Sequence, residues 1–413
     1  MKQKRYRILL YVLAFLLCFS APVASFAASP EEETAASLRH LLTYYQEVPV
    51  LLIGQADEEE VVLGKGVDEV RAIASMSKLM TYYVVMQAID QGKLALNQKV
   101  TISDQAASFN YPGSSNYGLK AGEQVTVSQL LTGMMVVSGN DAACALAEAT
   151  SGREEDFVVL MNDAARRLGY QTMHFVNASG LTTKDRQYNR SSARELYRFI
   201  LLLMEKYPQI KDLHKITVVR EPDRSFDKKS TLLEYLSGIP GLKGLKTGTS
   251  IEAGACFAGL FEVQSSKMKM TYDIVTIVMG APTNDARWRT TKELVDIAAG
   301  SFSPRVIVDA AQPVERYEMP DAKSGSVILY PAATFNDFTY VNAKFDVSYE
   351  IDRTIKAPTK ADQAFGRIRI ERDGRLLKEI PIVAHTPTEE AGLFTKLQRG
   401  LQNFFSFLTG LVA

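Results

Sequence analysis

The sequence predicts an α/β (α+β) unit over residues 28–303, a small all-β unit over 304–386 and an amphipathic helix over 387–413. Helical apolar spacing dominates the middle of the first range, and strand-like stretches lie near both of its ends. Apolar and polar residues then alternate with the period of a β-strand between 344 and 351. With 413 residues, the chain is also too long for one typical domain.

In the first unit, the segment 79–91 is apolar on most faces, as is typical of a buried helix. The segment 155–168 carries apolar residues at helical spacing. A single domain of this size is long but within the observed range. The expected helices are 79–91, 127–135, 142–150 and 155–168, and the expected strands are 48–53, 255–262 and 272–278.

The pattern changes near Pro304, where the all-β unit is expected to begin. Two strand-like stretches, 366–370 and 376–383, flank Asp373-Gly374, which is a strong hairpin signal. The last segment has a wide, phenylalanine-containing apolar stripe opposite polar residues, so it would either pack on the β unit or lie on a bilayer surface. Its terminal position after Pro387 favours a membrane anchor, and its polar face excludes a membrane span.

Composition and the first residues indicate an exported folded protein. Apolar residues make up 46% and charged residues 23% of the chain, as in ordinary globular proteins. A formal net charge of zero gives no global attraction for nucleic acid, so we exclude a nucleic-acid binder. Residues 1–27 combine a basic start, an apolar run over 8–19 and small residues at the cleavage positions of a signal peptide. That run is shorter than the about 20 residues of a bilayer span, which favours cleavage over anchoring.

No residue pattern indicates a metal or a cofactor. Beyond the leader the only cysteines are Cys144 and Cys256, and their apolar neighbours favour small buried side chains over a disulfide. The four histidines, at positions 40, 174, 214 and 385, have no ligand-like spacing.

The chemistry begins with Ser75 and Lys78, an S-x-x-K motif at the head of the apolar helix. A serine hydroxyl needs a neighbouring base to become a nucleophile, and one helical turn places Lys78 beside Ser75. A lysine buried near other cations loses its proton more readily and can be that base. The motif alone is weak, because 225–228 and 266–269 also match it, one in a charged stretch and one at an expected hairpin tip.

Two further motifs follow in order. Ser138-Gly139-Asn140 lies between two helical patterns, where Ser138 could relay a proton and Asn140 could hold a substrate backbone. Rival S-x-N matches at 108–110 and 114–116 show that this motif too is weak alone. Lys246-Thr247-Gly248-Thr249 occurs once, and Gly248 allows a strand to approach a ligand closely. S-x-x-K, S-x-N and K-T-G together form the signature of penicillin-binding proteins and β-lactamases.

With these motifs the chain resembles the low-molecular-mass penicillin-binding proteins, serine D-alanyl-D-alanine carboxypeptidases of the S11 peptidase type. The resemblance covers nearly the whole chain, including 72–78, 138–142 and 244–249. It implies a penicillin-binding-protein/β-lactamase-like transpeptidase fold, peptidoglycan stem peptides ending in D-Ala-D-Ala as substrate and β-lactams as acylating inhibitors. The β unit and the amphipathic tail also look like the C-terminal parts of that family. With the signal peptide, the tail predicts attachment to the outer face of the cytoplasmic membrane through the C-terminal helix. One departure is Lys229-Ser230-Thr231, where relatives often have an Asn-rich segment.

The resemblance also implies roles for individual residues. Catalysis would fall to Ser75, Lys78, Ser138 and Lys246, and the oxyanion would be held by the backbone N–H groups of Ser75 and Thr249. The substrate would be bound by Asn140, Thr247, Gly248, Thr249 and Arg287, with Arg289 as a nearby alternative to the last.

Three other functions remain open from sequence. A serine β-lactamase of one class deacylates with a glutamate in an E-x-x-L-N string, and no such string occurs here. A non-catalytic wall-associated scaffold on the same fold is disfavoured because the catalytic set is complete. A transpeptidase would use the same acyl-enzyme, and the sequence does not distinguish it.

Overall fold

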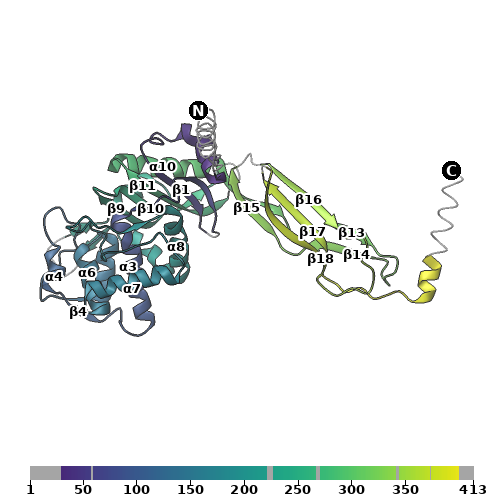
Figure 1. Ribbon diagram of the computed structural model, residues 1–413, viewed down its shortest axis with the longest axis horizontal. Helices are drawn as coiled ribbons and strands as arrows, with labels where there is room; N and C mark the ends of the chain where they lie inside the picture. The colour runs from purple at the N-terminus through teal and green to yellow at the C-terminus, as the bar shows by residue number, and fades with distance from the viewer. Residues whose placement is uncertain are drawn as a thin grey trace, which may run out of the picture.

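The computed structural model describes residues 29–56, 59–220, 227–266, 270–340, 344–372 and 374–399. The expected signal peptide and the last part of the expected C-terminal helix lie outside these ranges. A large α+β body and a smaller β body follow one another, and the described residues end in a short helix, 393–399, at the far end of the β body (Figure 1). Within these ranges, no helix has the length and apolar character required to cross a bilayer.

The larger body is built on a five-stranded antiparallel sheet in the order β2-β1-β11-β10-β9. Its central strands are buried along most of their length, because helices cover both faces. On one face lie α2 and α10, and on the other lies α8. The bounds are β1 (Val50–Gln55), β2 (Val61–Lys65), β9 (Leu242–Ser250), β10 (Gly254–Gln264), β11 (Thr271–Ala281), α2 (Pro30–Leu38), α8 (Ala193–Lys206) and α10 (Asn284–Ser301).

A helical region inserted between β2 and β9 packs below the sheet in Figure 1. Its central helix, α3 (Lys78–Asp90), is buried on most of its surface, as its apolar sequence predicts. Thr126 and Gln129 form a capping box at the start of α5, which fixes where that helix begins. The other helices are α4 (Asp104–Ser108), α5 (Val127–Val136), α6 (Asn140–Ser151), α7 (Glu154–Arg167) and α9 (Leu233–Gly238), with 3₁₀ segments η2 (Ala74–Ser77) and η3 (Pro208–Lys215).

Three two-stranded antiparallel sheets join the loops of this region. They are β3 (Arg71–Ala72) with β6 (Arg190–Ser191), β4 (Lys99–Thr101) with β5 (Gln124–Thr126), and β7 (Val218–Arg220) with β8 (Asp227–Lys229).

The smaller body contains a second five-stranded antiparallel sheet, in the order β13-β14-β18-β17-β16. The expected hairpin is present, because β17 pairs with β18 up to Arg372 and Arg375. A separate pair, β12 and β15, lies where the two bodies meet (Figure 1). The bounds are β12 (Phe302–Val308), β13 (Glu315–Glu318), β14 (Ser326–Pro331), β15 (Phe335–Tyr340), β16 (Phe345–Ile351), β17 (Gln363–Arg372) and β18 (Arg375–Ala384).

Candidate active site

Ser75 lies in η2, the single 3₁₀ turn that leads into α3. Its neighbours Ala74, Met76 and Ser77 are buried, whereas Ser75 itself is half-buried. Ala74 has a left-handed backbone (φ 45°), which is uncommon for a residue other than glycine and turns the chain sharply before the helix. The hydroxyl of Ser75 is therefore presented at the end of a buried helix by a tightly constrained backbone.

The amine of Lys78 lies within hydrogen-bond distance of three oxygen atoms. Its Nζ is 3.0 Å from Ser75 Oγ, 2.8 Å from Asn140 Oδ1 and 2.6 Å from the carbonyl oxygen of Ser179. The amide and carbonyl oxygens can only accept hydrogen bonds. A neutral amine donates its two N–H groups to them, so that its lone pair is left for the hydroxyl of Ser75.

Electrostatics favour this neutral form. Lys78 is fully buried, and its pKa lies well below the usual lysine value, first because burial penalises the charged amine and second because Lys246 adds a nearby positive charge. The carboxylates of Asp141 and Glu154 raise the pKa but do not outweigh burial. A lysine with these surroundings can act as a general base near neutral pH.

Ser138 and Lys246 form a second serine–lysine pair, with the lysine on strand β9 and the serine in the loop between α5 and α6. Lys246 on β9 is fully buried, and its Nζ donates to Ser138 Oγ at 2.9 Å and to the carbonyl oxygen of Thr247 at 3.0 Å. Ser138 has a left-handed backbone (φ 62°) in the connection between α5 and α6. Burial, followed by the charge of Arg287, lowers the pKa of Lys246 to about 7. The pair can therefore hold or release a proton at neutral pH.

Strand β9 brings the K-T-G motif against Ser75. It is an edge strand of its sheet and pairs only with β10 among the described strands. A Cβ atom added at Gly248 would lie 2.8 Å from the carbonyl oxygen of Ile73 and 3.1 Å from the backbone nitrogen of Ser75. Glycine therefore permits the close approach that places the free edge of β9 beside Ser75.

Arg287 reaches the end of β9 from α10. Its Nη1 donates to Thr249 Oγ1 at 3.1 Å, while Thr247 is buried two residues earlier on the same strand. The alternative, Arg289, has a 57% exposed side chain and forms an ion pair with Asp285. Of the two arginines, the structure thus brings only Arg287 to the K-T-G motif.

Asn140 begins α6 and connects Lys78 to the loop 114–119. Its Nδ2 donates to Ser114 Oγ at 3.2 Å, and its backbone N–H donates to the carbonyl oxygen of Ser115 at 2.8 Å. The buried carboxylate of Asp141 accepts from the backbone N–H groups of Tyr117, Gly118 and Leu119 at 2.7–2.9 Å. The loop, which contains one of the rival S-x-N matches, therefore forms a wall of the site and is held by two adjacent residues of α6.

Of the remaining rival motifs, the match 225–228 contributes one described residue, because Lys228 donates to the carbonyl oxygen of Asn116 in the loop 114–119 at 2.8 Å. The matches at 108–110 and 266–269 lie elsewhere. Ser108 is exposed and donates to Gln105 in its own short helix. Ser266 donates to Ala299 on α10, and the rest of its motif lies outside the described residues, as does Ser225. Cys144 and Cys256 are buried and unpaired by disulfides, as the sequence predicts.

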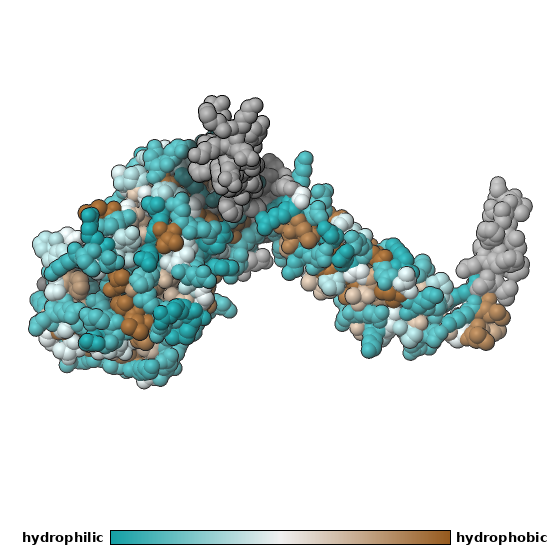
Figure 2. All heavy atoms as spheres, in the orientation of Figure 1, coloured by the Kyte–Doolittle hydropathy of each residue, from teal (hydrophilic) through white to brown (hydrophobic). Residues whose placement is uncertain are grey.

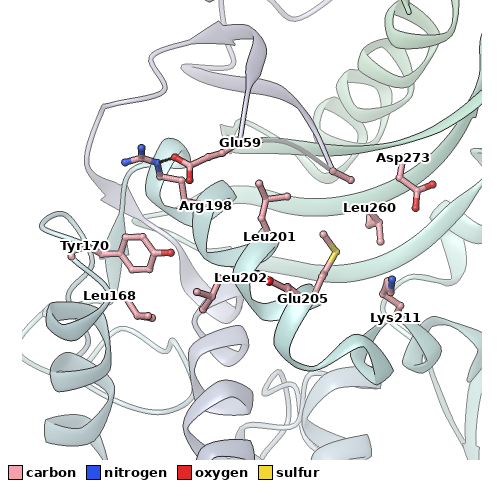
Figure 3. A pocket seen from close by; sticks show the side chains of 13 residues that line it. Glu59, Leu168, Tyr170, Arg198, Leu201, Leu202, Glu205, Lys211, Leu260 and Asp273 are labelled. Carbon is pink, nitrogen blue, oxygen red and sulfur yellow. Dashed lines mark hydrogen bonds and ion pairs between the residues drawn. The ribbon is translucent and has the colours of Figure 1, made fainter. Parts of the chain in front are cut away.

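A separate pocket of about 760 Å³ lies between α8, η3 and one end of the main sheet. Figure 3 shows the ring of Tyr170 pointing into it and an ion pair between Arg198 and Glu59 at its rim. No residue of the three motifs lines it, and its walls carry no serine, threonine or cysteine nucleophile. The pocket is therefore separate from the cluster around Ser75.

Comparison with known proteins agrees with this geometry. The Peptidase S11 family model, described as D-alanyl-D-alanine carboxypeptidase, matches residues 50–283. The D-alanyl-D-alanine carboxypeptidase DacF of Bacillus subtilis is 30% identical over 358 residues, which cover 86% of this chain and 89% of the relative. The chain belongs to the S11 D-alanyl-D-alanine carboxypeptidase family.

Solved structures resemble this S11 chain over more residues than the family model matches. A Streptococcus pneumoniae structure described as a peptidoglycan synthesis regulatory factor (PBP3) has a TM-score of 0.63 and 27% identity, covering 83% of this chain and 99% of that one. Penicillin-binding protein D2 of Listeria monocytogenes, solved in an ampicillin-bound form, has a TM-score of 0.52 and 28% identity, covering 61% and 96%. The penicillin-binding-protein fold predicted from the sequence is thereby confirmed.

Sequence reasoning on this S11 chain missed several contributors to the site. Ser179 binds Lys78 through a backbone carbonyl, which has no side-chain signature, across 101 residues of sequence. Asp141 directly follows the S-x-N motif and lies in the stretch 138–142 that carries the family resemblance, but no role for its carboxylate was predicted from the sequence. Tyr235 belongs to no recognisable sequence motif, yet its hydroxyl accepts a hydrogen bond from Arg287.

Proposed function

We propose that this chain is an exported serine D-alanyl-D-alanine carboxypeptidase that removes the terminal D-alanine from peptidoglycan stem peptides, with Ser75 as nucleophile. The observation that carries the proposal is the position of the Lys78 amine, fully buried and 3.0 Å from Ser75 Oγ, with its other two neighbours restricted to accepting hydrogen bonds. Family membership and the second buried pair, Ser138 and Lys246, support it.

In the first step, Ser75 Oγ attacks the carbonyl carbon between the two D-alanines while its proton passes to Lys78. The oxyanion forms beside the backbone N–H groups of Ser75 and Thr249, which belong to η2 and to the free edge of β9. When the C–N bond breaks, the departing amine takes a proton from Ser138, whose hydroxyl is restored by Lys246 at 2.9 Å. Thr247, Thr249 and Arg287 bind the substrate's terminal carboxylate, and Asn140 orients the peptide.

Before the second step, Lys78 releases to solvent the proton that it took from Ser75, and Lys246 regains one from solvent. A water molecule then attacks the acyl carbon and gives a proton to Lys78. The bond between that carbon and Ser75 Oγ breaks, and the proton returns to Ser75. The shortened peptide leaves with a new carboxylate. A β-lactam enters the same first step but remains attached, because its leaving amine stays tethered to the acyl group and hinders the approach of water.

Benzylpenicillin should form one covalent adduct with the purified chain, and the Ser75→Ala variant should form none. The reason is that an alanine at this position has no oxygen to acylate, whereas the rest of the site is unchanged. Intact mass spectrometry over time checks both, and release of D-alanine from a peptide ending in D-Ala-D-Ala checks turnover. Ser77→Ala is a matched control, since Ser77 is buried and donates only to Ala74 within the same turn.

The outcomes separate the alternatives. An adduct on both wild type and Ser75→Ala would remove Ser75 from the nucleophile role. Rapid loss of benzylpenicillin with no lasting adduct would assign a β-lactamase. Intact drug without adduct would assign a non-catalytic wall protein.

We further propose that the C-terminal segment holds the enzyme on the outer membrane surface. The described part of its helix, 393–399, exposes Leu393, Phe394 and Leu397 at 88%, 81% and 66%. Figure 2 shows apolar atoms gathered at this end of the molecule. Arg399, the last described residue of this helix, donates to the carbonyl oxygens of Ala322 and Lys323 in the β body, which holds the described part of the helix against that body. An apolar helical face held outward in this way suits the interface of a bilayer.

A chain ending at Gly392 should lose binding to phospholipid vesicles and keep its acylation rate with benzylpenicillin. Ending there retains Thr388 and Ala391, which pack in the β body, so that only residues 393–413 are removed. Co-sedimentation with phosphatidylglycerol vesicles measures the binding. Equal sedimentation of the shortened and full-length chains would overturn the anchor.

A further inference from the structure

Arg287 is held by one side chain that no motif contains. Its Nε donates to the hydroxyl of Tyr235 at 2.7 Å, and its Nη1 reaches Thr249 Oγ1 at 3.1 Å on the other side. Arg287 is only 7% exposed, so water contributes little to holding the guanidinium group. The hydroxyl of Tyr235 therefore fixes one edge of a planar group whose other edge faces the K-T-G motif.

Tyr235 is itself rigid. It is fully buried on α9, and its ring stacks on Phe257 of β10 with centroids 4.2 Å apart and planes 12° apart. One turn further along α9, a Cβ atom added at Gly238 would lie 2.5 Å from the ring of Trp288, so the same helix packs closely against the residue after Arg287. Burial raises the pKa of Tyr235 to about 12, so its hydroxyl keeps its proton at neutral pH. The tyrosine is thus a fixed neutral partner for the guanidinium group.

We infer that Tyr235 is a positioning residue that orients Arg287 toward the substrate's terminal carboxylate. The inference rests on the proposed function, because it assigns the carboxylate as the group that Arg287 serves. Without the Tyr235 hydroxyl, the guanidinium group of Arg287 gains rotational freedom. Its interaction with the substrate's carboxylate is then weaker. The loss should appear only for ligands with a carboxylate, and only while Arg287 is present.

Tyr235→Phe should lower the second-order rate of acylation by benzylpenicillin about tenfold, in keeping with the loss of one buried hydrogen bond to a charged group. Tyr272→Phe is the matched control, since it removes a buried tyrosine hydroxyl that donates to Ala298 and Phe302, away from Ser75. Both variants should melt at lower temperature than wild type, but Tyr272→Phe should acylate at the wild-type rate. Intact mass spectrometry against time supplies the rates.

A double-mutant cycle with Arg287→Gln decides whether Tyr235 acts through Arg287. The tenfold effect of Tyr235→Phe should fall below about twofold in the Arg287→Gln background. A tenfold loss that persists there would overturn the inference, because Tyr235 would then act by another route. With benzylpenicillin methyl ester, wild type and Tyr235→Phe should differ by less than about twofold, and an equal tenfold loss would remove the carboxylate from the argument.

Failure of the inference and failure of the proposed function give different results. If wild type forms no benzylpenicillin adduct, the proposed function fails before Tyr235 is tested. If wild type and Tyr235→Phe acylate at the same rate, the function stands and the positioning role is wrong.

Discussion

Replacing Lys78 with methionine should slow acylation by benzylpenicillin about 10²–10⁴-fold, the usual contribution of a general base. Methionine is similar in length and volume but cannot accept the proton of Ser75. It also leaves Asn140 Oδ1 and the carbonyl oxygen of Ser179 without the amine that now lies 2.8 and 2.6 Å away. The measurement is the rate of adduct formation by intact mass spectrometry, with circular dichroism as the check on folding.

Lys65→Met provides the matched control for this substitution. Lys65 is half-buried, whereas Lys78 is fully buried, but burial likewise lowers its pKa, and its Nζ donates to the carbonyl oxygens of Tyr45 and Val48, away from Ser75. Its replacement should leave the acylation rate unchanged. If Lys78→Met acylates within threefold of wild type, a threefold change being about 0.65 kcal/mol of activation free energy, another group must take the proton of Ser75.

In this site, buried cations also lower the pKa of neighbouring lysines. Burial is the main reason that the pKa of each lysine is lowered; the charge of Lys246 lowers the pKa of Lys78 further, and the charge of Arg287 lowers that of Lys246 further. Three cations near one cleft are costly when buried together, and losing protons relieves that cost. The same arrangement leaves Arg287 as the permanent positive charge at the end of β9, where an anionic carboxylate would be bound.

The sequence predicted the helices and the motif residues because their signals are local. The spacing of apolar residues indicated the helix over 79–91, and the structure has α3 from Lys78 to Asp90. The sequence did not predict the strand order β2-β1-β11-β10-β9, because pairing between distant strands leaves no short-range pattern. Similarly, the three motifs identified Ser75, Ser138 and Lys246, but their mutual distances depend on that strand order.

Two kinds of group that bind the catalytic residues could not be predicted from the sequence. They are backbone atoms, and side chains such as tyrosine that occur in many protein cores without a functional role. A carbonyl oxygen such as that of Ser179 is present in every residue, so only the fold shows that it binds Lys78. Tyr235 resembles many core tyrosines until its hydroxyl is seen beside Arg287. Such residues are found only when the complete set of hydrogen bonds around the motif residues is known.

Gly180→Ala should destabilise the larger body by about 2–5 kcal/mol, combining left-handed backbone strain with overpacking. Gly180 has φ 86°, and an added Cβ atom would lie 2.0 Å from the carbonyl oxygen of Ala74 and 2.9 Å from the backbone nitrogen of Ser75. These are backbone atoms of the nucleophile's own turn, so they cannot rotate away as a side chain could. The substitution should therefore also displace Ser75 and the adjacent carbonyl of Ser179, and slow acylation at least tenfold, or about 1.4 kcal/mol of activation free energy.

Gly152→Ala separates backbone strain from this close contact. Gly152 has nearly the same backbone angle (φ 84°), but an added Cβ atom there meets nothing within 4 Å. It should cost only about 1–2 kcal/mol, the strain of a left-handed non-glycine residue, and leave acylation unchanged. Melting temperature and acylation rate are measured for both variants. Equal losses in the two would show that Gly180 is needed only for its backbone angle, whereas a larger loss at Gly180 in both measurements would show that the loop over 178–180 holds the nucleophile's turn in place.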